Sequence, residues 1–281
     1  MRVEPAPTLP PSAPTFGDPS AARAFLRDGW VVTDLLDAEE VATLARVFDA
    51  IVGAPAEPIY SSWSQALSVR AQTDAAIRSV TLPRLCALLP RREMVFAGFM
   101  AKAVSPDTAF PIHQDPTIVD EERWTPLTFW VPLVAVEPET GCMQGVPGSH
   151  RWRAFPRPAF RAFPYQHEDA RLRPLLRPIP MRAGQVLLAH PALFHASTPN
   201  LGAGRRVACV GTLVPDDAEV RYYRRRETEP VIDAHPVPSG FYVRVRPEDA
   251  TDGLPVAGRF PDQPPPLDLD ALVALGAGAS V

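Results

Sequence analysis

The tripeptide His113-Gln114-Asp115 places an imidazole and a carboxylate two positions apart in the sequence. In an extended segment, side chains at positions i and i+2 point to the same face, so both groups can reach one point in space. Two ligands do not complete a metal site, and a third must come from elsewhere in the chain. With one further histidine, this pair has the composition of the 2-His-1-carboxylate face that binds non-heme Fe(II) and leaves positions open for substrate chemistry.

The second imidazole has five possible sources, which are His150, His167, His190, His195 and His235. His195 is the strongest candidate for the third ligand, because it follows a predicted strand over residues 185–189. Arg206 comes eleven residues later, on the next predicted strand, and would lie across a barrel mouth from the metal. A guanidinium there can make two parallel hydrogen bonds to a carboxylate, which is what the far end of a metal-chelating 2-oxoglutarate needs.

The elements that must position these groups are short strands behind a helical N-terminal third. Helices are predicted over residues 20–27, 37–51, 73–80 and 83–89, with a strand over 30–35. Asp37 and Glu40 form a capping-box pattern at the start of the second helix. Further strands are predicted over residues 94–104, 127–136, 142–146, 185–189, 207–214 and 241–245. This order predicts a mainly β protein, a sandwich or jelly roll with flanking helices.

The chain reads as one domain with a separate lead-in. Residues 1–18 are proline-rich and lack periodicity, which predicts a disordered segment. Residues 19–281 are predicted to form a single domain, with the jelly-roll core at about 93–215 and a weak helix over 267–275. Residues 151–180 form an arginine- and proline-rich insertion with little regular pattern.

Charge and composition exclude several classes of partner. The net charge is −4, no block of like charge occurs, and no run reaches the ~18 apolar residues of a membrane span. We therefore expect no nucleic-acid or membrane partner. The three cysteines are too few and too scattered for a disulfide framework or a zinc site. The N-terminus lacks a signal-peptide pattern, so a cytoplasmic location is expected.

At this point the sequence resembles a known family, the phytanoyl-CoA dioxygenase family of Fe(II)- and 2-oxoglutarate-dependent oxygenases. The resemblance covers roughly residues 22 to 215, and the order of its motifs is more specific than any one of them. The matching pieces are His113-Gln114-Asp115, residues 139–144 running into Val146-Pro147-Gly148-Ser149-His150, residues 184–188, and His195-Ala196-Ser197 with Asn200 and Arg206. The resemblance implies a double-stranded β-helix core, a cupin-like jelly roll.

The resemblance also implies roles for single residues. His113, Asp115 and His195 match the iron ligands, and Arg206 matches the arginine that anchors the distal carboxylate of 2-oxoglutarate. Arg205 is its neighbour on the opposite face of the strand, so only one of the two can point inward. The spacing after His195 favours Arg206.

Three further residues are candidates for the co-substrate site. Ser197 matches a small hydroxyl position that helps to hold 2-oxoglutarate. Lys102, on the strand before the metal loop, could contact 2-oxoglutarate or an acidic substrate, with an outward-facing, solvated lysine as the alternative. Trp130 is either a pocket-lining residue or a plain core tryptophan.

The retained carboxylate of Asp115 bears on the reaction. Related halogenating enzymes replace this residue with Gly or Ala to make room for chloride, so the resemblance implies hydroxylation instead. The expected function is oxidation of an unactivated C–H of a small molecule by O2, with release of succinate and CO2, in a setting such as secondary metabolism. The alternatives are a non-catalytic jelly-roll binding protein and a metal-dependent isomerase or lyase that needs no O2.

Overall fold

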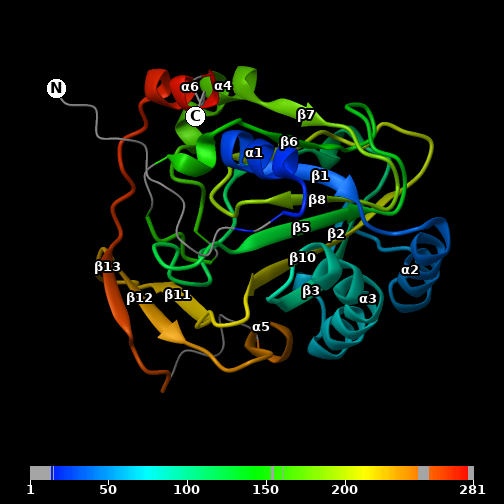
Figure 1. The fold of residues 1–281 in the computed structure, drawn as a ribbon, viewed down its shortest axis with the longest axis horizontal. Coiled ribbons are helices and arrows are strands. Elements are labelled where there is room, and N and C mark those ends of the chain that lie inside the picture. Colours follow the sequence, from blue (N-terminus) through cyan, green and yellow to red (C-terminus); the bar gives the residue numbers. More distant parts are fainter. Residues whose placement is uncertain (1–13, 15, 153–154, 160, 246–252, 278–281) are drawn as a thin grey trace.

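The computed structural model describes residues 14, 16–152, 155–159, 161–245 and 253–277. Of residues 1–18, which were predicted to be disordered, residues 14 and 16–18 belong to this part of the chain, and there Phe16 is buried against Phe25. The others lie outside the described residues. Figure 1 shows a layered β-structure with α2 and α3 at one end and a small sheet, β11 to β13, at the other. Among the described residues, no helix combines the length and apolar character needed to cross a membrane.

The N-terminal elements form as predicted. Helix α1 (Pro19–Asp28) ends at Gly29, whose φ of 91° lies in the left-handed region that favours glycine. Strand β1 (Trp30–Asp34) leads into helix α2 (Ala38–Ile51). The capping box of α2 is confirmed, because Asp37 accepts from the Glu40 backbone N–H while the Glu40 side chain accepts from the Asp37 backbone.

The prediction of two helices between residues 73 and 89 is wrong. A single helix, α3, spans Leu67–Leu88 with Pro83 inside it. Proline removes one helical hydrogen bond, which is why the sequence suggested a break there. However, Ile77 and Leu85 lie on either side of Pro83 and are both buried in the same apolar cluster. Packing against one surface therefore keeps the helix continuous across the proline.

The larger sheet has six strands in the order β1-β8-β5-β10-β3-β2. Its remaining members are β2 (Ile59–Ser61), β3 (Arg92–Lys102), β5 (Leu127–Pro132), β8 (Gln185–Ala189) and β10 (Arg206–Pro215). The neighbouring pairs are antiparallel. β2 was not predicted, and β5 ends four residues earlier than its predicted run.

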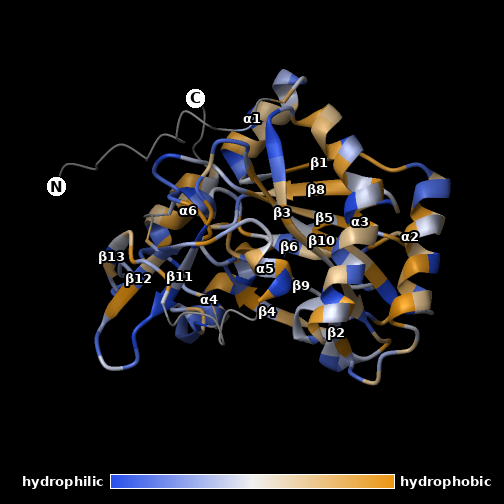
Figure 2. Ribbon diagram, turned by 90° about the horizontal axis from the view of Figure 1, so that it is seen from below, coloured by the Kyte–Doolittle hydropathy of each residue, from blue (hydrophilic) through white to orange (hydrophobic). Residues whose placement is uncertain are grey.

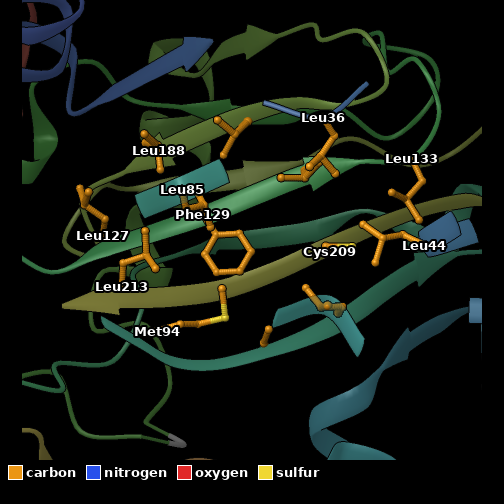
Figure 3. Close-up of a cluster of buried hydrophobic side chains, with 14 of the residues drawn as sticks. Leu36, Leu44, Leu85, Met94, Leu127, Phe129, Leu133, Leu188, Cys209 and Leu213 are labelled. Atoms are coloured by element: carbon orange, nitrogen blue, oxygen red, sulfur yellow. The ribbon is translucent and has the colours of Figure 1, made fainter. Parts of the chain in front are cut away.

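The two faces of this sheet have different roles. Along β5, Leu127, Phe129 and Val131 are fully buried in the main apolar cluster, to which α2 and α3 contribute. Figure 3 shows these strands sending Phe129, Leu127 and other apolar side chains into that cluster. The alternate residues Thr128 and Trp130 point to the other face. Helices therefore cover one face of the sheet, and the other is left for a site.

A smaller, four-stranded sheet lies in the order β4-β9-β6-β7. It consists of β4 (Phe110–His113), β6 (Met143–Gly145), β7 (Arg177–Ile179) and β9 (His195–Ser197). Its strands are only three or four residues long, and neither β7 nor β9 was predicted as a strand. Two antiparallel sheets with helices on the outer face confirm the predicted jelly-roll class.

The C-terminal region departs most from the sequence prediction. A three-stranded sheet of β11 (Arg221–Arg225), β12 (Val231–Pro236) and β13 (Gly258–Pro261) was not predicted. The strand predicted over 241–245 is a short helix, α5 (Phe241–Arg244). Phe241 and Tyr242 are both buried, whereas a strand would have turned adjacent side chains to opposite faces. Helix α6 (Leu269–Ala277) confirms the predicted weak helix.

Short helical turns connect these elements. They are η1 (Ser62–Ser64), η2 (Pro106–Thr108), η3 (Ser149–Arg151), η4 (Gln166–Glu168), α4 (Asp169–Leu172) and η5 (Arg173–Leu175). The last three lie in the predicted insertion. Figure 2 shows α2 and α3 with both apolar and polar residues along their length, as expected for helices that cover a sheet on one side and face water on the other.

Gly211 gives a test of the tight packing at the centre of β10. A Cβ added there would lie 2.3 Å from the Phe96 carbonyl oxygen and 2.5 Å from the Phe129 ring. We expect Gly211→Ala to lower the free energy of unfolding by about 1–3 kcal/mol, because neither neighbour is a flexible chain end. Gly204→Ala is the control, since nothing lies within 4 Å of its added Cβ. Equal stability of the two variants in urea titrations would contradict this packing.

Candidate metal and co-substrate site

Three of the predicted site residues come together between the sheets. His113 ends β4, His195 begins β9, and the two are cross-strand partners. Asp115 follows two residues after His113, and its Oδ1 lies 3.7 Å from His195 Nε2. One ligand atom from each of the three side chains falls within 4.8 Å of the others. Among the histidine, cysteine, aspartate and glutamate side chains that the structure describes, these three form the one cluster that could hold a metal ion.

Backbone carbonyls orient both imidazoles. His113 Nδ1 lies 2.9 Å from the Pro111 carbonyl oxygen, and His195 Nδ1 lies 2.9 Å from the Leu193 carbonyl oxygen. A carbonyl oxygen only accepts, so each Nδ1 must carry the proton and each Nε2 keeps a free lone pair. Metal-binding histidines commonly donate their other ring N–H in this way, which fixes the tautomer and the ring orientation.

The electrostatics favour neutral imidazole at His113. Burial, with the nearby His195 as a second cause, lowers the pKa of His113 to about 4, although Asp115 acts in the opposite direction. A metal ligand must be deprotonated, so a low pKa leaves the ring ready to bind at neutral pH.

The Asp115 carboxylate and backbone are held by three separate contacts. Thr128 Oγ1, on the inner face of β5, donates to Asp115 Oδ2 at 2.5 Å. The Asp115 backbone N–H donates to the Pro191 carbonyl at 2.9 Å. Arg157 Nε donates to the Asp115 carbonyl oxygen, also at 2.9 Å. These contacts leave Oδ1 facing His195.

Arg157 belongs to the predicted insertion, and its position beside the metal loop was not predicted. Its guanidinium is buried and forms a 2.5 Å ion pair with Glu121, which is itself largely buried. Its backbone pairs with Thr117, whose Oγ1 accepts from the Arg157 N–H. The insertion therefore clamps the loop that carries Asp115. The contacts of Arg157 join segments that are far apart in the sequence, so local sequence patterns do not predict them.

Arg206 lies on the inner face of the larger sheet, opposite the metal ligands. It is only 3% exposed, and its Nε and Nη1 atoms have no hydrogen-bond partner among the described residues. The guanidinium carbon lies 5.4 Å from the centre of the Trp130 ring. Burial lowers the pKa of Arg206 to about 10, so the group stays cationic at neutral pH. Arg205 turns the other way and donates to the Gly53 carbonyl at 2.6 Å.

Lys102 sits beside Arg206 because the two are cross-strand partners on β3 and β10. Directly opposed residues of an antiparallel pair project from the same face. Lys102 Nζ donates to Ser197 Oγ and to the Thr198 carbonyl, both at 2.6 Å. The side chain is 1% exposed, so the alternative of an outward-facing, solvated lysine is wrong. Burial, followed by repulsion from Arg206, lowers the pKa of Lys102 to about 7.

A cavity of about 690 Å³ joins these groups. His113, Asp115, His195, Arg206 and Ser197 all line it, as does Trp130. Lys102 does not line the cavity and lies behind Ser197. The volume is typical of pockets that bind drug-sized molecules, about 300–1,000 Å³.

The other candidate histidines lie outside the triad. His150 and His190 are buried next to each other, with ring centroids 5.6 Å apart. His167 is in η4, and His235 is in β12 with its Nδ1 3.0 Å from the Pro255 carbonyl. His195 is thus the histidine that the structure brings to the His113 and Asp115 pair.

A comparison with family models decides the family. The model described as phytanoyl-CoA dioxygenase (PhyH) matches residues 25–208, which is more than half of the chain. The chain belongs to the phytanoyl-CoA dioxygenase family. No curated protein matches the chain. The predicted resemblance is confirmed, and with it the class of non-heme Fe(II)- and 2-oxoglutarate-dependent oxygenases.

Three solved structures with a similar fold illustrate what this chain resembles. HygX from Streptomyces hygroscopicus, with nickel and 2-oxoglutarate bound, is 17% identical, with a TM-score of 0.53 over 71% of this chain and 88% of that chain. The epimerase SnoN from nogalamycin biosynthesis is 23% identical, with a TM-score of 0.54 over 72% and 84%. The carbocyclase SnoK from the same biosynthesis is 22% identical, with a TM-score of 0.51 over 75% and 90%.

The described residues fit the family's metal and co-substrate. Two imidazole Nε2 atoms and one carboxylate oxygen face a common point, which is the donor set of a non-heme Fe(II) site. The buried Arg206 guanidinium, whose Nε and Nη1 atoms find no partner in the part of the chain that the structure describes, fits the distal carboxylate of 2-oxoglutarate. The site is therefore suited to both groups.

Arg157 gives a test of how the metal loop is held. We expect Arg157→Ala to weaken nickel(II) binding, measured by calorimetry, by about tenfold, because residues that orient metal ligands commonly contribute 10- to 100-fold. Arg171→Ala is the matched control, since Arg171 is an exposed residue of the same insertion paired with Glu168.

Thr128→Val provides a second variant that removes only the hydroxyl contact to Asp115. It should also weaken nickel binding, and it keeps the prediction testable if Arg157→Ala folds poorly. Unchanged nickel affinity in both variants would show that Asp115 does not depend on these contacts.

Proposed function

We propose that this protein hydroxylates an unactivated C–H of an uncharged or weakly polar small molecule of secondary metabolism, with 2-oxoglutarate as co-substrate. The observation that carries the proposal is the Asp115 carboxylate held in the triad by Thr128, together with the buried Arg206, whose Nε and Nη1 atoms lack a partner among the described residues. A carboxylate in this position favours hydroxylation over halogenation. HygX has also been solved with hygromycin B bound, and SnoN and SnoK act in nogalamycin biosynthesis, which supports a secondary metabolite as substrate.

In the proposed mechanism, His113, Asp115 and His195 would hold the metal, with the two Nε2 atoms and Oδ1 as the available donors. Iron(II), when bound with 2-oxoglutarate and O2, supplies the oxidising power that cleaves a strong C–H bond while 2-oxoglutarate becomes succinate and CO2. Thr128 keeps the Asp115 carboxylate in one orientation. The largely apolar walls of the cavity keep water away from the reacting C–H.

Arg206 and Ser197 would bind the distal carboxylate of 2-oxoglutarate. The buried guanidinium of Arg206, whose Nε and Nη1 atoms have no partner among the described residues, can donate charge-assisted hydrogen bonds to it. Trp130 packs against the guanidinium and restricts its movement. Lys102 would act through Ser197, whose hydroxyl it holds from behind. Lys102 adds a second positive charge at this end of the cavity.

The test measures succinate formed from 2-oxoglutarate with added Fe(II), ascorbate and air. We expect Arg206→Met to raise the half-saturating 2-oxoglutarate concentration about 100-fold, because two charge-assisted hydrogen bonds contribute about 3 kcal/mol. Arg205→Met is the matched control and should leave it unchanged, since Arg205 points away from the cavity. His113→Ala serves as the blank.

Three results would contradict the proposal. Absence of succinate in the wild type would favour the non-catalytic binding protein. Turnover of a substrate without oxygen consumption would favour an isomerase or lyase. Equal effects of the Arg205 and Arg206 substitutions would place the co-substrate elsewhere.

The lowered pKa of Lys102 gives a pH prediction. Lysine occurs only at position 102, so protein labelled with [¹³C]lysine gives a single side-chain NMR signal. We expect its titration midpoint at about 7 in the free protein. Bound 2-oxoglutarate stabilises the charged amine and should raise that midpoint, so binding takes up a proton and affinity falls as pH rises above 7.

The same shift has a consequence for stability. Because the folded pKa lies below the unfolded value of 10.5, the unfolded chain binds more protons between pH 7 and 10.5. The contribution of Lys102 to stability therefore increases as pH rises through that window. An NMR midpoint near 10.5, or one that 2-oxoglutarate leaves unchanged, would contradict this view of Lys102.

A further inference from the structure

Three aromatic rings form one side of the outer cavity. They are Trp63 from η1, Phe96 from β3 and Tyr242 from α5, here called the aromatic wall. The ring centroids of Trp63 and Phe96 are 4.4 Å apart, and both lie about 6 Å from that of Tyr242, at 6.2 and 6.1 Å. Three elements far apart in the sequence therefore converge to build one aromatic surface inside the cavity.

Arg70 holds two members of the aromatic wall together from behind. The Arg70 guanidinium stacks on the Trp63 ring at 4.6 Å, and it donates to the Tyr242 carbonyl at 2.5 Å. Arg70 is 4% exposed, whereas Trp63 is 41% exposed despite these contacts. A tryptophan that is fixed from behind and still exposed on a cavity surface is typical of a binding anchor.

The charge of the cavity limits what it can accept. Among the described residues that line the cavity, Arg70 is the one charged side chain besides the triad and Arg206. Arg70 already contacts Trp63 and Tyr242. A charged group on the substrate would therefore be buried without a partner, at a large cost in free energy. The outer cavity is suited to an uncharged molecule.

The aromatic wall is partly a feature of this chain rather than of the family core. Tyr242 lies in α5, beyond residues 25–208 that match the family model. Its hydroxyl donates to the Arg221 carbonyl of β11 at 2.7 Å, so the C-terminal sheet holds the ring in place. The C-terminal region thus supplies one ring of the aromatic wall.

We propose that the substrate is an uncharged, planar, fused-ring aromatic molecule that stacks on the aromatic wall. Flat π-systems pack against aromatic rings in offset or tilted arrangements, and three rings offer more contact to a fused system than to a single ring or a flexible chain. This inference rests on the proposed function only for the claim that the bound molecule is oxidised. The binding surface itself is independent of the metal.

The test measures binding of 9-anthracenemethanol by fluorescence anisotropy, with nickel(II) and 2-oxoglutarate present so that Arg206 is engaged. We expect Trp63→Leu and Tyr242→Ala each to weaken binding about tenfold, because each removes one stacking ring. Tyr242→Phe keeps the ring and loses only the hydroxyl contact to the Arg221 carbonyl, so it should weaken binding much less than Tyr242→Ala. Phe260→Ala is the control, since Phe260 stacks on Tyr223 in the C-terminal sheet and does not line the cavity.

Two further probes test charge and shape. The anion 9-anthracenecarboxylate and the saturated cage 1-adamantanemethanol should each bind at least about tenfold more weakly than 9-anthracenemethanol. Equal affinity for the anion would overturn the uncharged class, and equal affinity for the cage would overturn the planar aromatic class. Unchanged binding in Trp63→Leu, which replaces a ring that is 41% exposed, would overturn the site.

Succinate formation separates this inference from the proposed function. Succinate production without wall-dependent probe binding would overturn the substrate class and leave the oxygenase proposal standing. Wall-dependent binding without succinate production would support the aromatic site and contradict the oxygenase proposal.

Discussion

The site depends on the register of two antiparallel strand pairs on facing sheets. In the smaller sheet, His113 lies opposite His195, so a single cross-strand pair brings both imidazoles to one side. In the larger sheet, Arg206 lies opposite Lys102, which places both cations on the inner face. A slip of one residue in either pair would turn these side chains to the wrong face. Helices α2 and α3 bury the outer face of the larger sheet and so fix its orientation.

The electrostatic character of the cavity follows from this arrangement. Arg206 and Lys102 are almost completely buried and lie close together. Burial lowers the pKa of both groups, and repulsion from Arg206 lowers the pKa of Lys102 further. Such a pair is costly in a protein interior unless an anion compensates it. A dicarboxylate bound between the triad and Arg206 would supply that compensation. The aromatic wall is uncharged and needs no compensating anion. The proposed substrate surface therefore differs in charge from the proposed co-substrate site.

Much of the site could be predicted from the sequence because its determinants are local. The His-x-Asp pair, the spacing from His195 to Arg206 and the capping box at Asp37 each depend on a few neighbouring residues. Arg157 and Tyr242 could not be predicted, because their positions depend on an irregular insertion and on a C-terminal sheet whose strands have no strong pattern. The helical α5, predicted as a strand, and the uninterrupted α3 show tertiary packing overriding local propensity.

The most direct test of the central claim is a crystal structure with manganese(II) and 2-oxoglutarate, obtained without oxygen. We expect the metal between His113 Nε2, His195 Nε2 and an Asp115 carboxylate oxygen, and 2-oxoglutarate extending from the metal to the Arg206 guanidinium. A metal bound by other residues, or 2-oxoglutarate bound away from Arg206, would contradict the account of how these two sheets build the site.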